Sequence, residues 1–128
     1  MNRLSKWALA MVVGLTTIAP AFASPAGTWE IEYRDSRYDV TLCGDGTELC
    51  AKLIWLGNGA DTEENLPYLN TFLINQAKPD GEGRWKGDLH LYGQTASGTI
   101  EQVSDDEMTI TGCLFLVACR TFRMYRMD

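Results

Sequence analysis

Four cysteines and a single histidine are the residues of this sequence with the most distinctive chemistry. Cys43 and Cys50 enclose "GDGTEL", and Cys113 and Cys119 enclose "LFLVA". A zinc site with four thiolate ligands brings its cysteines in pairs separated by two to four residues, and a dithiol redox centre uses C-x-x-C. Because neither spacing occurs here, the even number of cysteines favours two disulfides, provided that the protein is exported.

The first 23 residues have the three-part plan of a secretory signal peptide. Arg3 and Lys6 give a basic start, residues 7–18 form an uncharged and mostly apolar run, and residues 21–23 supply an A-x-A cleavage site. The run is too short to cross a bilayer, which takes about 20 apolar residues. We therefore expect export into an oxidising compartment, where cysteines pair.

Residues 24–128 have the length of one domain. Cleavage would remove Arg3 and Lys6 and leave 9 of the 11 Lys and Arg residues against 17 Asp and Glu, a net charge of −8. This acidic balance argues against binding to nucleic acid or to an anionic membrane surface. We expect a single domain, periplasmic or secreted, with no integral membrane segment after cleavage. The sequence leaves the oligomeric state open.

A period of two recurs along the chain, as expected for strands that bury one face. Trp29, Ile31 and Tyr33, for example, alternate with charged residues. The predicted strands are 28–34, 38–43, 50–56, 68–74, 85–92, 95–103, 108–116 and 119–126, of which segment 68–74 is ambiguous between strand and helix. Eight short strands with one apolar face each are typical of a closed antiparallel barrel or a sandwich, and closure removes the exposed edges.

The same alternation places all four cysteines on the polar, outward side of their strands. Cys43 and Cys50 flank one predicted hairpin, and Cys113 and Cys119 flank another. Cross-strand neighbours on one face have Cβ atoms about 4.5–5.5 Å apart, close to the reach of a disulfide. We therefore predict the pairs Cys43–Cys50 and Cys113–Cys119, each contributing roughly 2–2.5 kcal/mol in the chain-entropy treatment of short loops.

No combination of residues predicts catalysis, a metal or a cofactor. His90, the only histidine, falls on the outward side of its strand. A single histidine excludes a multi-histidine metal site and leaves few options for a Ser-His-Asp arrangement. The sequence has neither a G-x-S-x-G nucleophile elbow nor a G-x-x-x-x-G-K phosphate loop. Met108 and Met124 fall on the apolar side, where core packing rather than copper ligation is expected.

The first and last predicted strands carry one further pair of motifs. Gly27-Thr28-Trp29 opens the first strand, and Arg126 closes the last with the inward parity of Phe122 and Met124. First and last strands are neighbours in a closed barrel, so Arg126 is expected to lie across the Trp29 ring and close one barrel end. Such a cation–π contact is worth about 0.5–2 kcal/mol. A G-x-W opening with a terminal arginine resembles the signature of lipocalins and other calycins.

Four longer stretches resemble, in the same order, a bacterial family called domain of unknown function 2147. They are "SPAGTW", "CGDGTELCAKLIWL", "RWKGDLHLYG" and "GCLFLVACRTFRMYR", and together they span nearly all of residues 24–128. The resemblance implies a secreted or periplasmic protein with a lipocalin-like fold. The stretch "DTEENLPYLNTFLINQ" departs from the N-P and R-P-L-rich loop that family members often carry, so a ligand preference held by that loop does not transfer.

A small barrel of eight strands either fills with side chains or holds one small ligand. The inward positions expected to line a ligand cavity are Tyr33, Val40, Leu42, Leu53, Trp55, Trp85, Leu89, Leu91, Ile110, Leu114, Phe122 and Met124. Ala51, Gly87 and Gly112 are small inward residues that would leave space. We expect a non-enzymatic module that binds a small hydrophobic or amphipathic ligand. The alternative is a structural or protein-interaction factor of the cell envelope with a filled core.

Overall fold

The computed structural model describes residues 22–115 and 118–128. The predicted signal peptide, residues 1–23, lies outside the described residues except for Phe22 and Ala23. The described residues form eight strands: Gly27–Ile31 (β1), Ser36–Cys43 (β2), Glu48–Leu56 (β3), Phe72–Pro79 (β4), Arg84–Leu91 (β5), Gln94–Gln102 (β6), Glu107–Leu114 (β7) and Ala118–Arg126 (β8).

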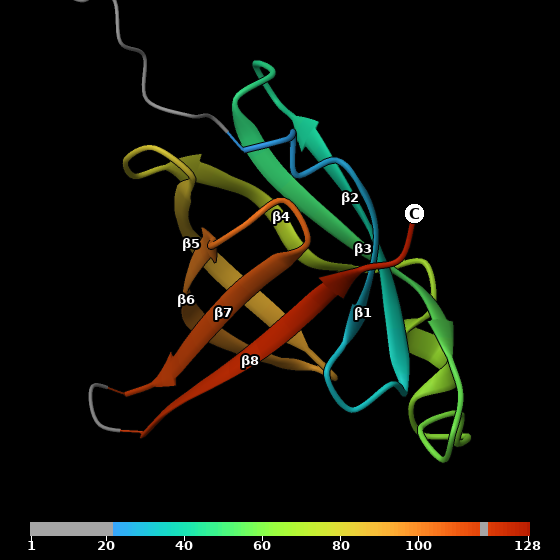
Figure 1. Ribbon diagram of the computed structural model, residues 1–128. Coiled ribbons are helices and arrows are strands. Elements are labelled where there is room, and N and C mark those ends of the chain that lie inside the picture. Colours follow the sequence, from blue (N-terminus) through green and yellow to red (C-terminus); the bar gives the residue numbers. More distant parts are fainter. Residues whose placement is uncertain (1–21, 116–117) are drawn as a thin grey trace, which may run out of the picture.

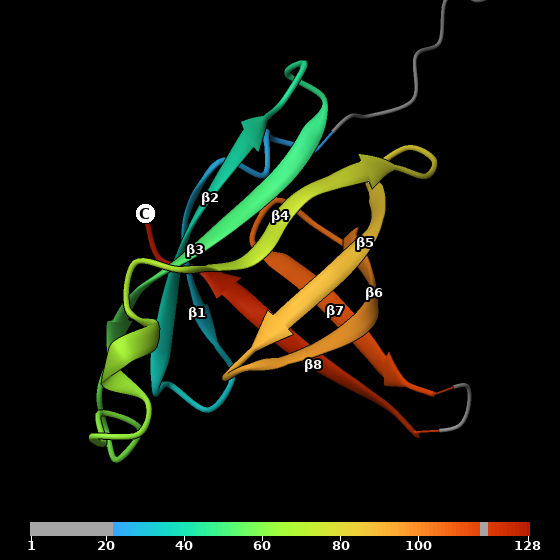
Figure 2. The ribbon, with the colours of Figure 1, turned by 180° about the vertical axis from the view of Figure 1, so that it is seen from behind.

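The strands form one closed antiparallel barrel in the order in which they follow one another along the chain (Figure 1). Every strand pairs with its neighbours in sequence, and β1 pairs with β8 to complete the ring. Figure 2 shows the same ring from behind, with β4 between β3 and β5. The predicted eight-stranded antiparallel barrel is therefore confirmed, and closure leaves no open sheet edge.

The ambiguous segment 68–74 turns out to contain both kinds of structure. A short 3-10 helix, η2 (Leu66–Tyr68), precedes β4, which begins only at Phe72. Pro67 suits the start of a helical turn because its fixed φ matches and its missing N–H has no partner there. The long link between β3 and β4 thus ends in a helical turn, and the strand follows it.

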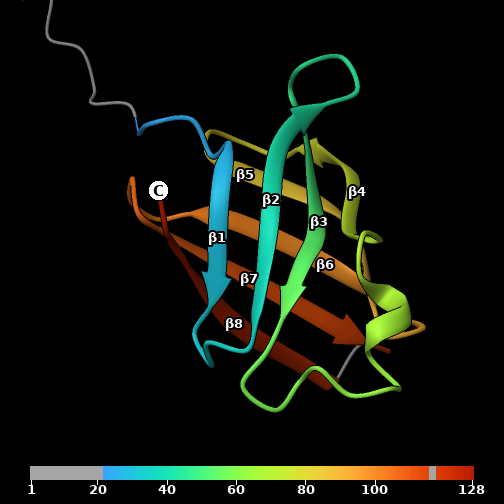
Figure 3. The same cartoon turned by 90° about the vertical axis from the view of Figure 1, so that its right-hand side faces the viewer.

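The connections between strands divide into two sets, one at each end of the barrel. The β2–β3, β4–β5 and β6–β7 turns lie at the end where the chain enters β1 and leaves β8 (Figure 3). The β1–β2, β3–β4 and β5–β6 connections lie at the opposite end, together with the end of β7 and the start of β8. We call the end with the β2–β3, β4–β5 and β6–β7 turns the closed end, and the opposite end the open end.

Two residues predicted to line the barrel interior do not, and each has a local cause. Arg37 pairs with Trp55 while Tyr38 pairs with Leu53, so β3 carries a bulge at Ile54. A bulge inserts one residue and reverses the alternation beyond it. The Trp55 ring consequently lies on the outer surface, with the Arg37 guanidinium carbon 4.1 Å from the ring centroid.

Leu42 is the second such residue, and it is exposed rather than buried. The β2–β3 hairpin runs past the end of its neighbour, since β1 pairs with β2 only as far as Val40. Leu42 therefore has no β1 side chain beside it. Its alternation is inward, but the barrel has already ended at this position.

Both predicted disulfides are present. The Cα atoms of Cys43 and Cys50 are 6.0 Å apart, and those of Cys113 and Cys119 are 4.0 Å apart. Cys113 faces Cys119 directly across β7 and β8, whereas Cys43 reaches Cys50 diagonally across β2 and β3. Cys50 is nevertheless buried, because β4 covers it and the Gln76 backbone N–H donates to its sulfur at 3.3 Å.

Candidate functional site

Arg126 closes one end of the barrel. Its guanidinium donates to the backbone oxygens of Ser24, Ala26 and Asp105 at 2.7, 2.8 and 2.9 Å. Its Cζ atom lies 4.6 Å from the centroid of the Trp29 ring, in the stacked position that the sequence suggested. The side chain is only 12% exposed. One arginine therefore ties the N-terminal segment and the β6–β7 turn to the last strand.

Two tryptophans fill the interior at the same end. Trp29 is fully buried and its indole N–H donates to the backbone oxygen of Pro25 at 2.9 Å. The indole N–H of Trp85 donates to the backbone oxygen of Thr47, in the β2–β3 turn, at 2.9 Å. A buried indole usually finds such a partner. Both acceptors belong to segments that cover the barrel end, so ring packing and end closure support each other.

The opposite end opens into a cavity of about 650 Å³. Its floor is made by Ile31, Leu89, Ile110 and Met124, which are buried and bring no charge or hydroxyl to the base. Phe122 stands above Met124 on the same strand and forms part of the wall. The volume lies within the range of about 300–1,000 Å³ that is typical of small-molecule pockets.

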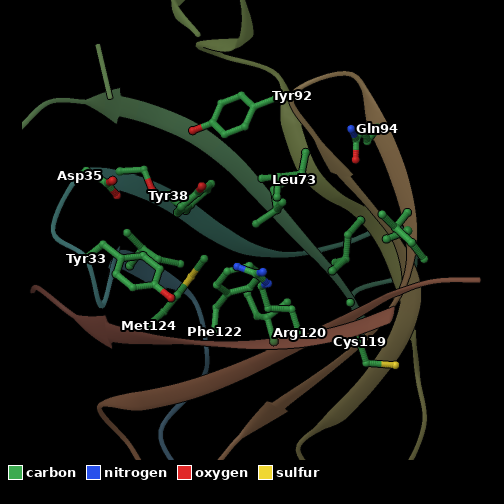
Figure 4. A pocket seen from close by; sticks show the side chains of 18 of the residues that line it. Tyr33, Asp35, Tyr38, Leu73, Tyr92, Gln94, Cys119, Arg120, Phe122 and Met124 are labelled. Carbon is green, nitrogen blue, oxygen red and sulfur yellow. The ribbon is translucent and has the colours of Figure 1, made fainter. Parts of the chain in front are cut away.

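Most of the polar lining groups come from strand ends and connections at the open end, among them Asp35, Tyr92 and Gln94 (Figure 4). Burial raises the pKa of Tyr38 to about 12, still further above neutral pH than that of an ordinary phenol, and the protonated hydroxyl can donate a hydrogen bond. Burial, and then the charge of Asp35, also raises the pKa of Tyr92. Asp35 and Arg120 are the charged residues among those described in the lining. The cavity is therefore graded from an apolar floor to a polar mouth.

Seven of the twelve predicted lining residues border the cavity: Tyr33, Leu89, Leu91, Ile110, Leu114, Phe122 and Met124. The others lie elsewhere. Val40 and Leu53 are buried in the core, and Trp85 is bonded to the β2–β3 turn. Leu42 lies beyond the barrel end and Trp55 lies outside the barrel, for the reasons given above. That the seven contact a ligand stays a prediction.

The most informative lining residues are polar ones that the apolar pattern did not single out. Tyr38 shares its parity with Val40, and Arg120 shares its parity with Phe122 and Met124. The alternation therefore already placed both residues on the inward side. They could have been predicted to line the cavity if polar inward positions had been counted along with the apolar ones. Both residues line the cavity.

The small inward residues do not create the cavity as the sequence suggested. Ala51 is buried in the core away from it. A Cβ atom on Gly87 would lie 2.9 Å from the Cα atom of Ala77, so this glycine permits close strand packing. Gly112 does border the cavity, but a Cβ atom there would lie 2.9 Å from Leu89 Cδ1. Leu89 thus occupies the space that the glycine leaves.

Other chemistry-bearing residues lie apart from the cavity. His90 is exposed, and its Nδ1 atom lies 3.3 Å from the Thr95 hydroxyl. Met108 is buried in the core. Within residues 22–115 and 118–128, no three His, Cys, Asp or Glu side chains are grouped so as to hold a metal. No helix in this part of the chain has the length and apolar character to span a membrane.

A closed eight-stranded antiparallel barrel with an internal cavity at one end defines a lipocalin-like barrel. The chain belongs to the family DUF2147, described as an uncharacterized protein conserved in bacteria, whose model matches residues 27–126. The resemblance seen in the sequence is therefore confirmed.

Among solved structures, the chain is similar to protein HP1028 from the human pathogen Helicobacter pylori, described as belonging to the lipocalin family. The TM-score is 0.62 at 15% sequence identity, over 83% of this chain and 84% of that one. At this identity the likeness establishes the fold alone. No curated protein matches the sequence.

Proposed function

We propose that this protein is an exported, non-enzymatic module that binds one small hydrophobic or amphipathic molecule inside its barrel. The observation that carries the proposal is the cavity of about 650 Å³, with its apolar floor and polar mouth. Such a gradient suits a ligand whose tail is buried while its head group stays near water. The alternative, a structural or protein-interaction factor of the cell envelope, was expected to have a filled core, and a cavity of this volume speaks against it.

Export is part of the same proposal. Two disulfides are the expected covalent support of a small domain in an oxidising compartment, such as the periplasm or the extracellular space. The signal peptide of residues 1–23 and a single domain of residues 24–128 fit this placement. The acidic balance of the chain, with a formal net charge of −6, argues against nucleic acid as the partner.

The chemistry of the lining supports binding rather than catalysis. Ser36 is the one serine among the described lining residues, and no histidine lies in that lining to act as its base. Cys119 is held in a disulfide and has no thiol to react. A hydroxyl without a base is a weak nucleophile at its ordinary pKa.

A series of neutral alcohols tests the cavity without involving charge. Octanol, decanol and dodecanol should compete with increasing strength against a fluorescent amphiphile bound to the folded protein. Each buried methylene is worth about 0.8 kcal/mol, or roughly fourfold in affinity, until the tail reaches the floor. Absence of saturable binding by any of the three alcohols would contradict the proposal.

A plug variant locates that binding inside the barrel. Ala96 lines the cavity from β6, where it pairs with Leu89, so Ala96→Phe should fill the space and abolish dodecanol binding. Thr95 is its neighbour on the same strand with the opposite, outward parity and an exposed side chain. Thr95→Phe is the matched control and should leave binding unchanged. Equal losses in both variants would place the alcohol outside the cavity.

A further inference from the structure

Among the described residues that line the cavity, Arg120 and Asp35 carry charge, and they differ in their surroundings. Asp35 lies in the β1–β2 turn close to the phenols of Tyr38 and Tyr92, which its charge reaches. Arg120 is on β8, and Figure 4 shows its side chain directed into the cavity beside Phe122. Its cross-strand partner is Gly112, which presents no side chain against it.

Arg120 is also set apart from the other arginines of its strand. Arg123 pairs with Glu107, and Arg126 is held by three backbone oxygens. None of the ion pairs or hydrogen bonds in residues 22–115 and 118–128 involves the Arg120 side chain. The two residues outside that part of the chain and nearest to it in sequence are a leucine and a valine, which carry no charge.

A guanidinium offers five N–H donors in a planar fork and has no acceptor, and the fork matches a carboxylate. An arginine placed in the wall of an apolar cavity without a carboxylate partner is therefore a binding site for an anion. Resting on the proposed function, we infer that the cavity selects a single-chain amphiphile with a carboxylate head group, which the Arg120 guanidinium binds near the mouth.

The geometry of β8 also fixes the direction of the ligand. Arg120 and Met124 are four residues apart on one strand, about 13 Å at the usual rise per residue. Both point inward, Arg120 near the mouth and Met124 at the buried floor. The carboxylate therefore lies at the mouth and the tail runs past Phe122 toward Met124. Asp35, in the β1–β2 turn at the same end of the barrel, repels the carboxylate and thus favours its contact with Arg120.

The chain as a whole is acidic, with a formal net charge of −6. At long range this charge disfavours an anionic ligand. The preference for a carboxylate head group must therefore come from direct contact with Arg120. Removal of that one side chain should eliminate this preference. A hydrogen bond to a charged group is worth enough to change affinity by about tenfold to a hundredfold.

The test compares three ligands that share one tail: dodecanoate, dodecanol and dodecylamine, at neutral pH on the full folded protein. The wild type should bind dodecanoate about tenfold to a hundredfold more tightly than dodecanol, and dodecylamine most weakly. Arg120→Gln should remove this preference by weakening dodecanoate far more than dodecanol. Arg120→Lys should retain part of the preference, because lysine keeps the charge and loses the fork.

Arg123→Gln is the matched control, since Arg123 lies on the same strand but is outward and paired with Glu107. It should leave all three affinities unchanged. The inference is overturned if dodecanol binds as tightly as dodecanoate, if dodecylamine binds most tightly, or if Arg120→Gln weakens dodecanol equally. Failure of dodecanol to bind at all would instead overturn the proposed function, so the two failures are distinguishable.

Discussion

The two ends of the barrel use arginines of the same strand in opposite ways. Arg126, at the closed end, is nearly buried, stacks on Trp29 and donates to three backbone oxygens. Arg120, at the open end, is exposed, and its side chain has no hydrogen-bond or ion-pair partner among the residues that the structure describes. An arginine whose three side-chain nitrogens each donate to the backbone holds segments together, whereas one whose nitrogens have no such partners is available to a ligand.

The aromatic residues repeat this division. Trp29 and Trp85 are buried at the closed end, with their indole N–H groups bonded to the chain. At the open end, Tyr33 and Tyr92 are exposed, and small residues such as Ala96 stand in the wall. Large rings fill one half of the interior and leave the other half hollow. The packing that stabilises the fold and the cavity that is proposed to bind a ligand thus lie at different ends of the barrel.

The largest difference in stability is expected between two variants that each lose one aromatic ring, one ring at the closed end and one at the open end. Trp29→Ala should lower the free energy of unfolding by about 3–5 kcal/mol, as for other fully buried large rings. Phe122→Ala should cost only about 1–2 kcal/mol, because this ring is half-buried and already borders a void. Urea unfolding of the two variants measures both values. Equal losses would mean that the two ends are packed alike.

The disulfides offer a second comparison, because one lies at each end. Replacing Cys43 and Cys50 together by serine, or Cys113 and Cys119 together, should cost about 2–2.5 kcal/mol in either case, since the loops are of similar length. Dodecanol binding should weaken only in the second variant, because the Cys113–Cys119 disulfide joins β7 and β8 where both strands border the cavity. Urea unfolding and alcohol titration of both variants check this. A loss of binding on removal of Cys43–Cys50 would show that the ends are coupled.

The smallest effect concerns the arginines themselves. Arg126→Ala should cost about 1–2 kcal/mol through its lost hydrogen bonds and ring contact. Arg120→Ala should change stability by no more than about 0.5 kcal/mol, the scale of an ordinary surface substitution.

A double-mutant cycle of Arg126→Ala with Trp29→Phe separates the two contributions at the closed end. The coupling free energy, obtained from urea unfolding of the four proteins, should be about 0.5–1 kcal/mol, with the rest due to the three backbone acceptors. A coupling equal to the whole effect would mean that the ring contact alone closes the barrel.

Much of the fold was predictable from local pattern. Alternation with a period of two marked the strands, and the outward parity of Cys113 and Cys119 predicted their direct pairing. The contact between Arg126 and Trp29 followed from closure, since the first and last strands must then be neighbours. Parity failed at Trp55, where a bulge on β3 reversed it. A bulge depends on the register in which two strands pair, and the sequence of one strand does not predict that register.

The sequence by itself determined which residues of the regular strands face inward, which cysteines pair and which strands adjoin, because these follow from parity, chain order and closure. Only the tertiary structure decided where the barrel is filled and where it is hollow. Leu89 shows why: it covers Gly98 and Gly112, which belong to two other strands, and so fills space that the glycines would leave. A void is the space left after side chains from several strands have packed together, so the pattern of a single strand cannot predict it.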